Sequence, residues 1–271
     1  MQPALQRRVQ RYGWDKASAA YEAFWARQLR PAQDQLLAMA GIRPGEAVLD
    51  IACGTGLVTR RAAELAGPGG SVVATDLSEQ MVALTRQACE GDGLAPVRAL
   101  RMGAEKLELP DASFDVALDA LGLMYVPDVR LALAEMRRVL RPGGRAVAAV
   151  WGARDHCGWA DIFPIVDARV QSDVCPMFFA LGTGDRLALD LAATGFHDIT
   201  TERIETMLEY EDADGALGAA FAGGPVAMAY SRFDEPTREA AHAEYLASIA
   251  PFRHGDGYRI PGEFVVVSGI G

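Results

Sequence analysis

Between residues 47 and 152 the chain alternates five short apolar segments with helix-type segments, and this alternation limits the fold more than any other feature. The apolar segments are typical of strands buried on both faces: AVLDIA (47–52), SVVATD (71–76), VRALRMG (97–103), FDVALDA (114–120) and RAVAAVWG (145–152). Strands that alternate with helices form parallel sheets covered on both faces. We therefore expect an α/β fold with a doubly wound, mostly parallel sheet. Its ligand should lie beyond the carboxyl ends of the strands, where the strand order reverses.

Local signals place the helices between these strands. Ser78 precedes EQMVALTRQAC (79–89) and is a natural N-cap, and Leu77 and Val82 have the spacing of a hydrophobic staple. A further helix is predicted over residues 128–140. The residues expected on its inward side are apolar: Leu131, Leu133, Met136, Val139 and Leu140.

The segments on either side of this core are expected to cover it. Helix is predicted over residues 15–40, with Pro31 starting a second helix, so that residues 1–40 form a helical cap. Two later strand-like segments, ITTERIETMLEY (199–210) and EFVVVSGIG (263–271), bring the predicted sheet to seven strands. Residues 211–258 form a helical insertion before the last strand. We expect this insertion to act as a lid that its glycines allow to move.

The loop after the first strand, in VLDIACGTG (48–56), indicates a nucleoside ligand. Gly54 and Gly56 provide backbone without side chains, but Thr59 stands where a dinucleotide fingerprint has its third glycine or alanine. S-adenosylmethionine has no phosphate and needs an anionic group for its ammonium, which Asp50 can supply. Asp76 can accept hydrogen bonds from the ribose hydroxyls of either ligand. These residues alone leave both ligands open.

Four segments, in this order and at this spacing, distinguish the two ligands: VLDIACGTG (48–56), VVATDLSEQM (72–81), GAEKLELPDASFDVAL (103–118) and EMRRVLRPGGRAVAAVWG (135–152). Together they closely resemble the motifs of class I S-adenosylmethionine-dependent methyltransferases, in particular the type-11 group that includes ubiquinone/menaquinone-biosynthesis methyltransferases. The resemblance implies one Rossmann-like methyltransferase domain over residues 1–271, with its cofactor-binding core at 41–152. It also implies S-adenosylmethionine as the cofactor.

The resemblance assigns roles to individual residues. The loop that faces the methionine and ribose is matched by Asp50, Ala52, Cys53, Gly54, Thr55 and Gly56. Asp76 matches the acid that binds the ribose diol, and the apolar residues beside the adenine are Leu77 and Met81. The turn at the adenine edge is Gly103, Ala104 and Glu105. Asp119 and Ala120 match the backbone under the methionine part. The aromatic residues of the leading helix are Tyr12, Trp14, Tyr21 and Trp25, and Tyr21 is expected to approach the cofactor.

The acceptor side is less well defined. Many relatives carry a His-His pair where this chain has Met124 and Tyr125, so Met124 is expected in the core or the pocket wall and Tyr125 as a hydrogen-bond donor of the wall. His156 is the candidate general base and substrate contact, and its alternative role is that of a surface-loop histidine. Methyl transfer is an in-line displacement whose rate comes largely from positioning. The acceptor atom, O, N, C or S, stays open.

Other functions remain as alternatives. One is a catalytically silent protein that binds S-adenosylmethionine, and another is a nicotinamide-dependent enzyme on a similar fold. A third is a thiol-assisted metalloid methyltransferase that would use Cys157 and Cys175. The four cysteines have no paired zinc-ligand spacing, so we expect free thiols and no metal site.

Charge and hydropathy narrow the partners. The net charge of −10 argues against a broad phosphate-binding surface, so the expected substrate is a small molecule and not a nucleic acid. The start of the chain is polar and aromatic, and no apolar run approaches the roughly 20 residues that span a bilayer. We therefore expect a cytoplasmic protein with no membrane partner. If the insertion does not move, it is instead expected to form a homodimer interface.

Overall fold

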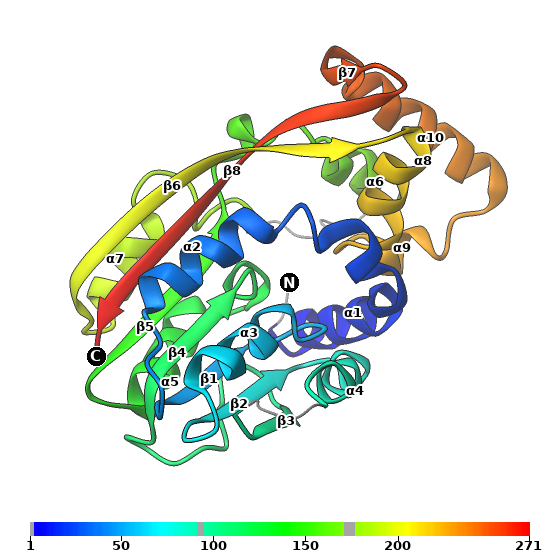
Figure 1. The fold of residues 1–271 in the computed structure, drawn as a ribbon. Coiled ribbons are helices and arrows are strands. Elements are labelled where there is room, and N and C mark those ends of the chain that lie inside the picture. Colours follow the sequence, from blue (N-terminus) through cyan, green and yellow to red (C-terminus); the bar gives the residue numbers. More distant parts are fainter. Residues whose placement is uncertain (1–2, 91–94, 171–176) are drawn as a thin grey trace.

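The fold is that of a computed structural model, which describes residues 3–90, 95–170 and 177–271. A mixed sheet runs through the molecule in the order β3-β2-β1-β4-β5-β8-β6 (Figure 1). Its strands are β1 (Ala47–Ile51), β2 (Ser71–Asp76), β3 (Val97–Arg101), β4 (Phe114–Ala120), β5 (Leu140–Trp151), β6 (His197–Tyr210) and β8 (Gly257–Ile270), and the two-residue β7 (Arg253–His254) pairs with β8. The first five strands are parallel, and β8 is antiparallel to both β5 and β6. The predicted doubly wound, mostly parallel sheet is confirmed, and β7 makes it eight-stranded.

The strand order reverses at β1. From β1 the chain first adds β2 and β3 on one side, and it then returns to place β4 on the other side. The loops that follow β1 and β4 therefore leave the sheet next to each other. Ligands of open α/β sheets bind at such a reversal.

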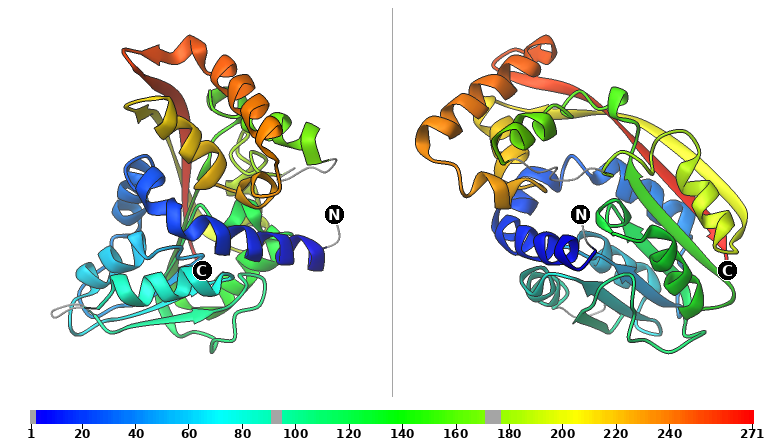
Figure 2. Two further views of the ribbon diagram at one scale, coloured as in Figure 1. Left: turned by 90° about the vertical axis from the view of Figure 1, so that its right-hand side faces the viewer. Right: turned by 180° about the vertical axis from the view of Figure 1, so that it is seen from behind.

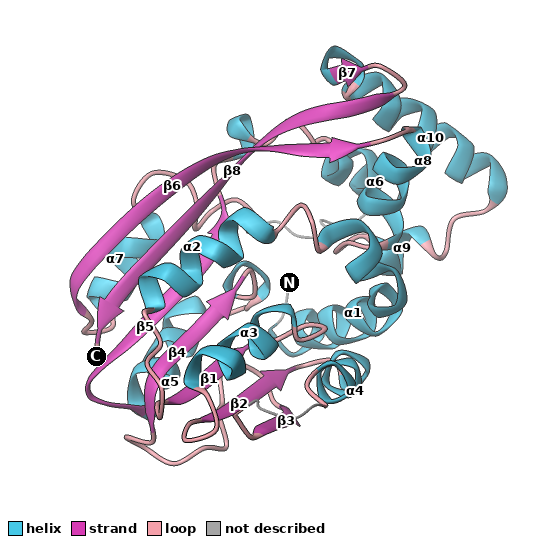
Figure 3. Ribbon diagram, in the orientation of Figure 1, coloured by secondary structure: helices cyan, strands magenta, loops and turns pink. Residues whose placement is uncertain are grey.

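Helices cover both faces of the sheet (Figure 3). The longer helices are α1 (Pro3–Trp25), α2 (Arg30–Ala40), α3 (Leu57–Ala66), α4 (Glu79–Ala88), α5 (Val129–Val139), α6 (Ile162–Val170), α7 (Arg186–Ala193) and α10 (Glu235–Ser248). One apolar cluster includes residues of α2 and α3, and a second cluster includes residues of α5 and α7. None of the helices in the described residues is long and apolar enough to cross a membrane.

Two sequence predictions about helices are tested directly. The predicted N-cap of α4 is confirmed, because the Ser78 hydroxyl accepts a hydrogen bond from the backbone N–H of Met81. The predicted inward side of α5 is wrong at Leu131, which is 47% exposed, while Ala132 is buried in its place. The buried stripe is therefore Ala132, Leu133, Met136 and Val139, and Leu131 faces solvent although it directly precedes Ala132.

The last two long strands extend beyond the rest of the sheet. β8 pairs with β5 only from Phe264 onward, but it pairs with β6 as far as Tyr258. The hairpin therefore overhangs the carboxyl ends of the parallel strands (Figure 2). It carries the insertion, which holds α8 (Ala213–Leu217), a π-helical turn (Gly218–Ala222), α9 (Ala227–Tyr230) and α10. The insertion packs against α1, so the two segments predicted to cover the site lie side by side.

Glycines of the insertion allow close packing against α1. A Cβ on Gly218 would overlap the ring of Phe24, and one on Gly223 would lie 3.1 Å from Trp25 Cδ1. Both glycines have ordinary helical-region φ angles, of −59° and −88°. Because these two glycines have no side chain, they leave room for aromatic side chains of α1. Neither glycine adopts the positive-φ conformation that favours glycine.

Candidate functional site

The loop after β1 turns with a left-handed backbone. Ala52, Gly54 and Gly56 have φ angles of 56°, 57° and 90°. Gly56 could not carry a side chain without crowding, since a Cβ there would lie 3.2 Å from Thr85 Cα. Ala52 is unusual, because a non-glycine residue held at positive φ stores strain, and such strain clusters at functional sites.

The loop after β4 meets the β1 loop. Leu121 also has a positive φ, of 71°, and a Cβ on Gly122 would overlap the Cβ of Ala52. Asp119 fixes this second loop, because its Oδ1 accepts hydrogen bonds from the N–H groups of Gly122 and Leu123, both at 2.9 Å. Two strained residues, Ala52 and Leu121, thus line one cavity at the point where the strand order reverses.

Asp76 ends β2 and lines the same cavity. Its Oδ2 accepts a hydrogen bond from Gly54 N at 3.0 Å, and its Oδ1 accepts one from Ser78 N at 2.8 Å. Burial raises the pKa of this carboxyl to about 6, although backbone N–H groups favour the charged form. Asp76 is therefore an ionised acceptor at neutral pH, and each oxygen keeps a further lone pair for a ligand.

Asp50 and Asp119 lie behind the loops and not on the cavity surface. Asp50 Oδ2 accepts a hydrogen bond from the Thr59 hydroxyl at 2.5 Å. One oxygen of each carboxyl, Oδ1 of Asp50 and Oδ2 of Asp119, is buried with no hydrogen-bond partner among the described residues. Burial raises the pKa of each to about 7. The sequence predicts that Asp50 supplies negative charge to a ligand ammonium directly or through water; it is not among the residues that line the cavity, and its Oδ2 is bonded to Thr59 of α3 (Leu57–Ala66).

The turn after β3 forms one end of the cavity. The lining residues at this end are Leu77, Met81, Met102, Gly103, Ala104 and Glu105. Glu105 is held on two sides: its Oε2 lies 2.7 Å from Arg7 Nη1 of α1, and its Oε1 accepts a hydrogen bond from Asp128 N. This end therefore combines apolar side chains with the Asp76 carboxylate, as a nucleoside requires.

Helix α1 covers the cavity. Asp15 Oδ1 accepts a hydrogen bond from the Ser78 hydroxyl at 2.6 Å, which fastens α1 to the start of α4. Further along, the ring of Tyr21 lies over the β1 loop, with its Cε1 3.9 Å from the position of a Cβ on Gly54. Burial, followed by the nearby Asp76 charge, raises the pKa of the Tyr21 hydroxyl well above its usual range. Tyr21 therefore remains a neutral hydrogen-bond donor.

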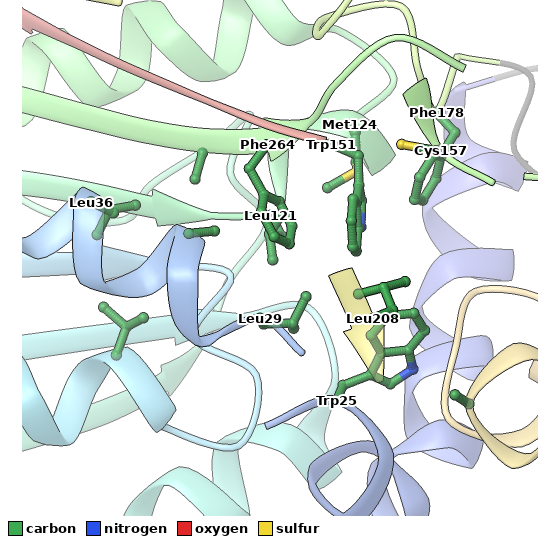
Figure 4. Close-up of a cluster of buried hydrophobic side chains, with 14 of the residues drawn as sticks. Trp25, Leu29, Leu36, Leu121, Met124, Trp151, Cys157, Phe178, Leu208 and Phe264 are labelled. Carbon is green, nitrogen blue, oxygen red and sulfur yellow. The ribbon is translucent and has the colours of Figure 1, made fainter. Parts of the chain in front are cut away.

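The other end of the cavity is aromatic. All four tryptophans of the chain, Trp14, Trp25, Trp151 and Trp159, line it. Ring contacts connect them with the remaining aromatic residues of the wall: Trp14 meets Tyr21 and Tyr125 at 5.8 and 5.1 Å, and Trp159 meets Trp151 and Phe178 at 4.8 and 5.6 Å. Figure 4 shows Trp25 and Trp151 extending toward each other from α1 and β5. The whole cavity has a volume of about 140 Å³.

The predicted site residues divide into two groups. Those that line the cavity are Tyr21, Ala52, Gly54, Asp76, Leu77, Met81, Gly103, Ala104, Glu105, Ala120 and Tyr125. The others are not among its lining residues: Asp50, Cys53, Thr55, Gly56, Asp119, Met124 and His156. Of these, Met124 is buried in the apolar core, and Cys53 packs beside Thr85.

His156 lies in an ion-pair cluster away from the cavity lining. Its Nδ1 is 3.1 Å from Glu263 Oε1, and the other Glu263 oxygen lies 2.9 Å from Arg203. About half of the His156 side chain is exposed. This position does not place His156 as a base on an acceptor in the cavity.

The cysteines do not form a thiolate site among the described residues. Cys53, Cys89 and Cys157 are free, as predicted, and Cys175 lies outside the described residues. Cys157 is buried, and burial raises the pKa of its thiol to about 12. No group of metal-ligating side chains was found in the described ranges.

Several lining residues were not predicted as site residues from the sequence. Leu121, Trp151, Trp159 and Phe178 belong to the cavity, and Trp151 and Trp159 form part of its aromatic end. A usable signal was present, because the tryptophans occur only in the leading helix and around the end of β5. Both segments were expected at the carboxyl edge of the sheet.

The residues present fit S-adenosylmethionine. The loop of residues 52–56 presents backbone without bulky side chains to the cavity. At Gly122 there is no room for a side chain, because a Cβ there would overlap the Cβ of Ala52. Asp76 lies at the expected ribose position. Asp50 and Asp119 each have one buried oxygen without a partner among the described residues, behind the loops, where a bound ammonium or sulfonium would favour the ionised carboxylate.

Comparisons with known proteins agree with this geometry. Residues 49–148 match the family model described as "Methyltransferase domain". The ubiquinone/menaquinone biosynthesis C-methyltransferases of Burkholderia mallei and Burkholderia thailandensis are each 35% identical to this chain over 198 residues, covering 71% of this chain and 77% of theirs.

Solved structures show the same fold at lower identity. A putative methyltransferase from Bacillus halodurans is 18% identical, with a TM-score of 0.60, and the match covers 88% of this chain and 97% of that one. A phosphoethanolamine N-methyltransferase from Haemonchus contortus, in complex with S-adenosyl-L-methionine, is also 18% identical. Its TM-score is 0.61, and the match covers 94% of this chain and 57% of the other.

Proposed function

We propose that this chain, which belongs to the type-11 family of class I S-adenosylmethionine-dependent methyltransferases, methylates a small, uncharged, largely aromatic acceptor. The enzyme uses S-adenosylmethionine. The observation that carries the proposal about the acceptor is the aromatic end of the cavity, to which all four tryptophans contribute.

The nucleoside end of the cavity is where this chain would hold the cofactor. Asp76 would accept hydrogen bonds from the ribose hydroxyls, and Leu77 and Met81 would pack beside the adenine. Tyr21 would close the site over the Gly54 backbone. When bound, S-adenosylmethionine supplies a methyl group already activated on a sulfonium.

The distribution of charge over the cavity supports an uncharged acceptor. The charged residues among those described in its lining are Arg7, Asp76 and Glu105. Asp76 and Glu105 lie at the nucleoside end, and Arg7 is paired with Glu105. A phosphorylated acceptor, such as the one named for the Haemonchus enzyme, would find no unpaired cation among these residues. Aromatic walls with few polar groups suit an apolar ligand.

Positioning is the main contribution of the chain to the reaction. The aromatic walls orient the acceptor for an in-line approach, and α1 with the insertion excludes water. Tyr21 is a poor base because its pKa is raised, and His156 lies outside the lining. The described residues therefore favour an acceptor that provides its own nucleophile, such as an electron-rich ring carbon or a readily ionised hydroxyl. The named role of the Burkholderia relatives, C-methylation in quinone biosynthesis, is compatible with such a ring.

A screen tests the proposal. Purified protein is incubated with a metabolite extract and S-adenosylmethionine labelled in its methyl group, and the labelled products are identified by mass spectrometry. We expect a methylated apolar aromatic compound. A labelled phosphate ester or quaternary amine would contradict the assigned acceptor class. Binding of S-adenosylhomocysteine with no labelled product from any extract would support the catalytically silent alternative.

A further inference from the structure

A second, smaller cavity lies behind the aromatic end of the site. Its volume is about 10 Å³, enough for about one water molecule. The residues that line this rear cavity alone are Ile162, Tyr210, Ala220, Val226 and Tyr245. Most of this lining is apolar, and it comes from α6, from the end of β6 and from the insertion.

Three side chains line both cavities: Trp25, Trp159 and Pro225. The two indoles therefore form most of the wall between the acceptor end and the rear cavity. Both are nearly fully buried, with 8% and 5% of their surface exposed, and their ring centroids are 6.2 Å apart. Trp151 belongs to the same ring cluster and is equally buried, but it lines the front cavity and not the rear one.

Packing alone holds the partition in place. The indole nitrogens of Trp25 and Trp159 are buried and have no hydrogen-bond partner among the described residues. A smaller side chain at either position therefore breaks no hydrogen bond. Such a change joins the front and rear cavities, while the apolar walls on both sides stay in place.

We propose that Trp25 and Trp159 are specificity-determining residues that set the depth of the acceptor end and so limit the length of the acceptor. This inference rests on the proposed function, since it concerns the same cavity. An acceptor ring fits in front of the partition, and a substituent that points away from the nucleoside end meets the two indoles. Short apolar substituents are accepted, and longer ones are excluded.

The test uses 4-alkylphenols, from methyl to hexyl, as probes of depth. Their dissociation constants are measured by calorimetry on protein saturated with S-adenosylhomocysteine. In the wild-type protein, each buried methylene is expected to tighten binding about fourfold until the chain meets the partition. Beyond that length the affinity stops rising. In Trp159→Leu the rise is expected to continue to longer chains.

Trp151→Leu is the matched control, because it removes an indole of the same cluster that does not separate the two cavities. In this variant, the affinity for 4-alkylphenols is expected to stop rising at the same alkyl-chain length as in the wild-type protein. Adding Ala220→Leu to Trp159→Leu refills the rear cavity and should restore the wild-type limit. If Trp159→Leu does not fold, as judged by circular dichroism, Trp159→Phe replaces it, with a smaller extension expected.

The outcomes separate the two proposals. An identical chain-length limit in wild-type, Trp159→Leu and Trp151→Leu proteins overturns the partition and leaves the proposed acceptor class intact. Binding of S-adenosylhomocysteine without binding of any alkylphenol by any variant overturns the proposed acceptor class, and the partition with it. A limit that moves in Trp159→Leu but not in Trp151→Leu supports both.

Discussion

Replacement of Asp76 is the sharpest test of the nucleoside end. The carboxylate accepts backbone hydrogen bonds at 3.0 and 2.8 Å and faces the cavity with its remaining lone pairs. Hydrogen bonds to charged groups contribute about 1.5–3 kcal/mol. Asp76→Ala is therefore expected to weaken binding of S-adenosylhomocysteine by roughly ten- to a hundredfold. Asp76→Asn removes the charge and one of the two acceptor oxygens, and its NH2 group would face a backbone N–H of Gly54 or Ser78, so binding should weaken in this variant as well.

The pH dependence of binding gives a second, independent measurement. The pKa of Asp76 in the free protein is about 6, so the ionised acceptor is present above this pH and is lost as the pH falls through it. The dissociation constant of the wild-type protein should therefore rise between pH 7 and pH 5. Asp76→Asn lacks this titrating carboxyl, so its binding should change less over the same range, and the change that remains comes from Asp50 and Asp119, whose pKa values are about 7. Calorimetry at several pH values measures both effects.

Asp115→Asn is the matched control for Asp76. Asp115 also accepts a backbone hydrogen bond, from Ala47 N at 2.8 Å, and it pairs with Arg141, but it lies at the amino ends of the strands, away from the cavity. Its replacement should leave binding of S-adenosylhomocysteine unchanged. If folded Asp76→Ala binds as tightly as the wild-type protein, Asp76 does not bind the ribose, and the assigned orientation of the nucleoside is wrong.

Two further predictions concern stability and the cover of the site. Burial raises the pKa of Asp119 to about 7, so the folded state holds a proton that the unfolded state releases near pH 4. The free energy of unfolding should therefore fall as the pH rises from 5 to 8. Thermal melts of Asp119→Asn should show a smaller fall over the same pH range. Asp15→Ala removes the hydrogen bond between α1 and Ser78. Hydrogen exchange in residues 3–25 should therefore be faster than in the wild-type protein, and S-adenosylhomocysteine should bind more weakly. If the variant exchanges at wild-type rates, packing alone holds α1 in place.

The sequence by itself determined the parts of this protein that depend on neighbouring residues. Neighbouring residues in the sequence are enough to specify three features: the apolar runs of the five parallel strands, the Ser78 cap and the glycine loop at residues 52–56. For the same reason the position of the site could be predicted, because the end of the first strand in a doubly wound sheet is fixed by the strand order.

The tertiary structure decided which side chains reach the cavity. Asp50 adjoins the glycine loop in the sequence, yet packing buries it behind that loop, where it contacts Thr59. Trp14 and Trp159 are 145 residues apart in the sequence and line one cavity, because α1 and the segment after β5 both cross the same edge of the sheet. Burial and long-range convergence depend on the packing of the whole chain, so the positions of the tryptophans in the sequence could indicate the edge of the sheet but not which side chains meet there.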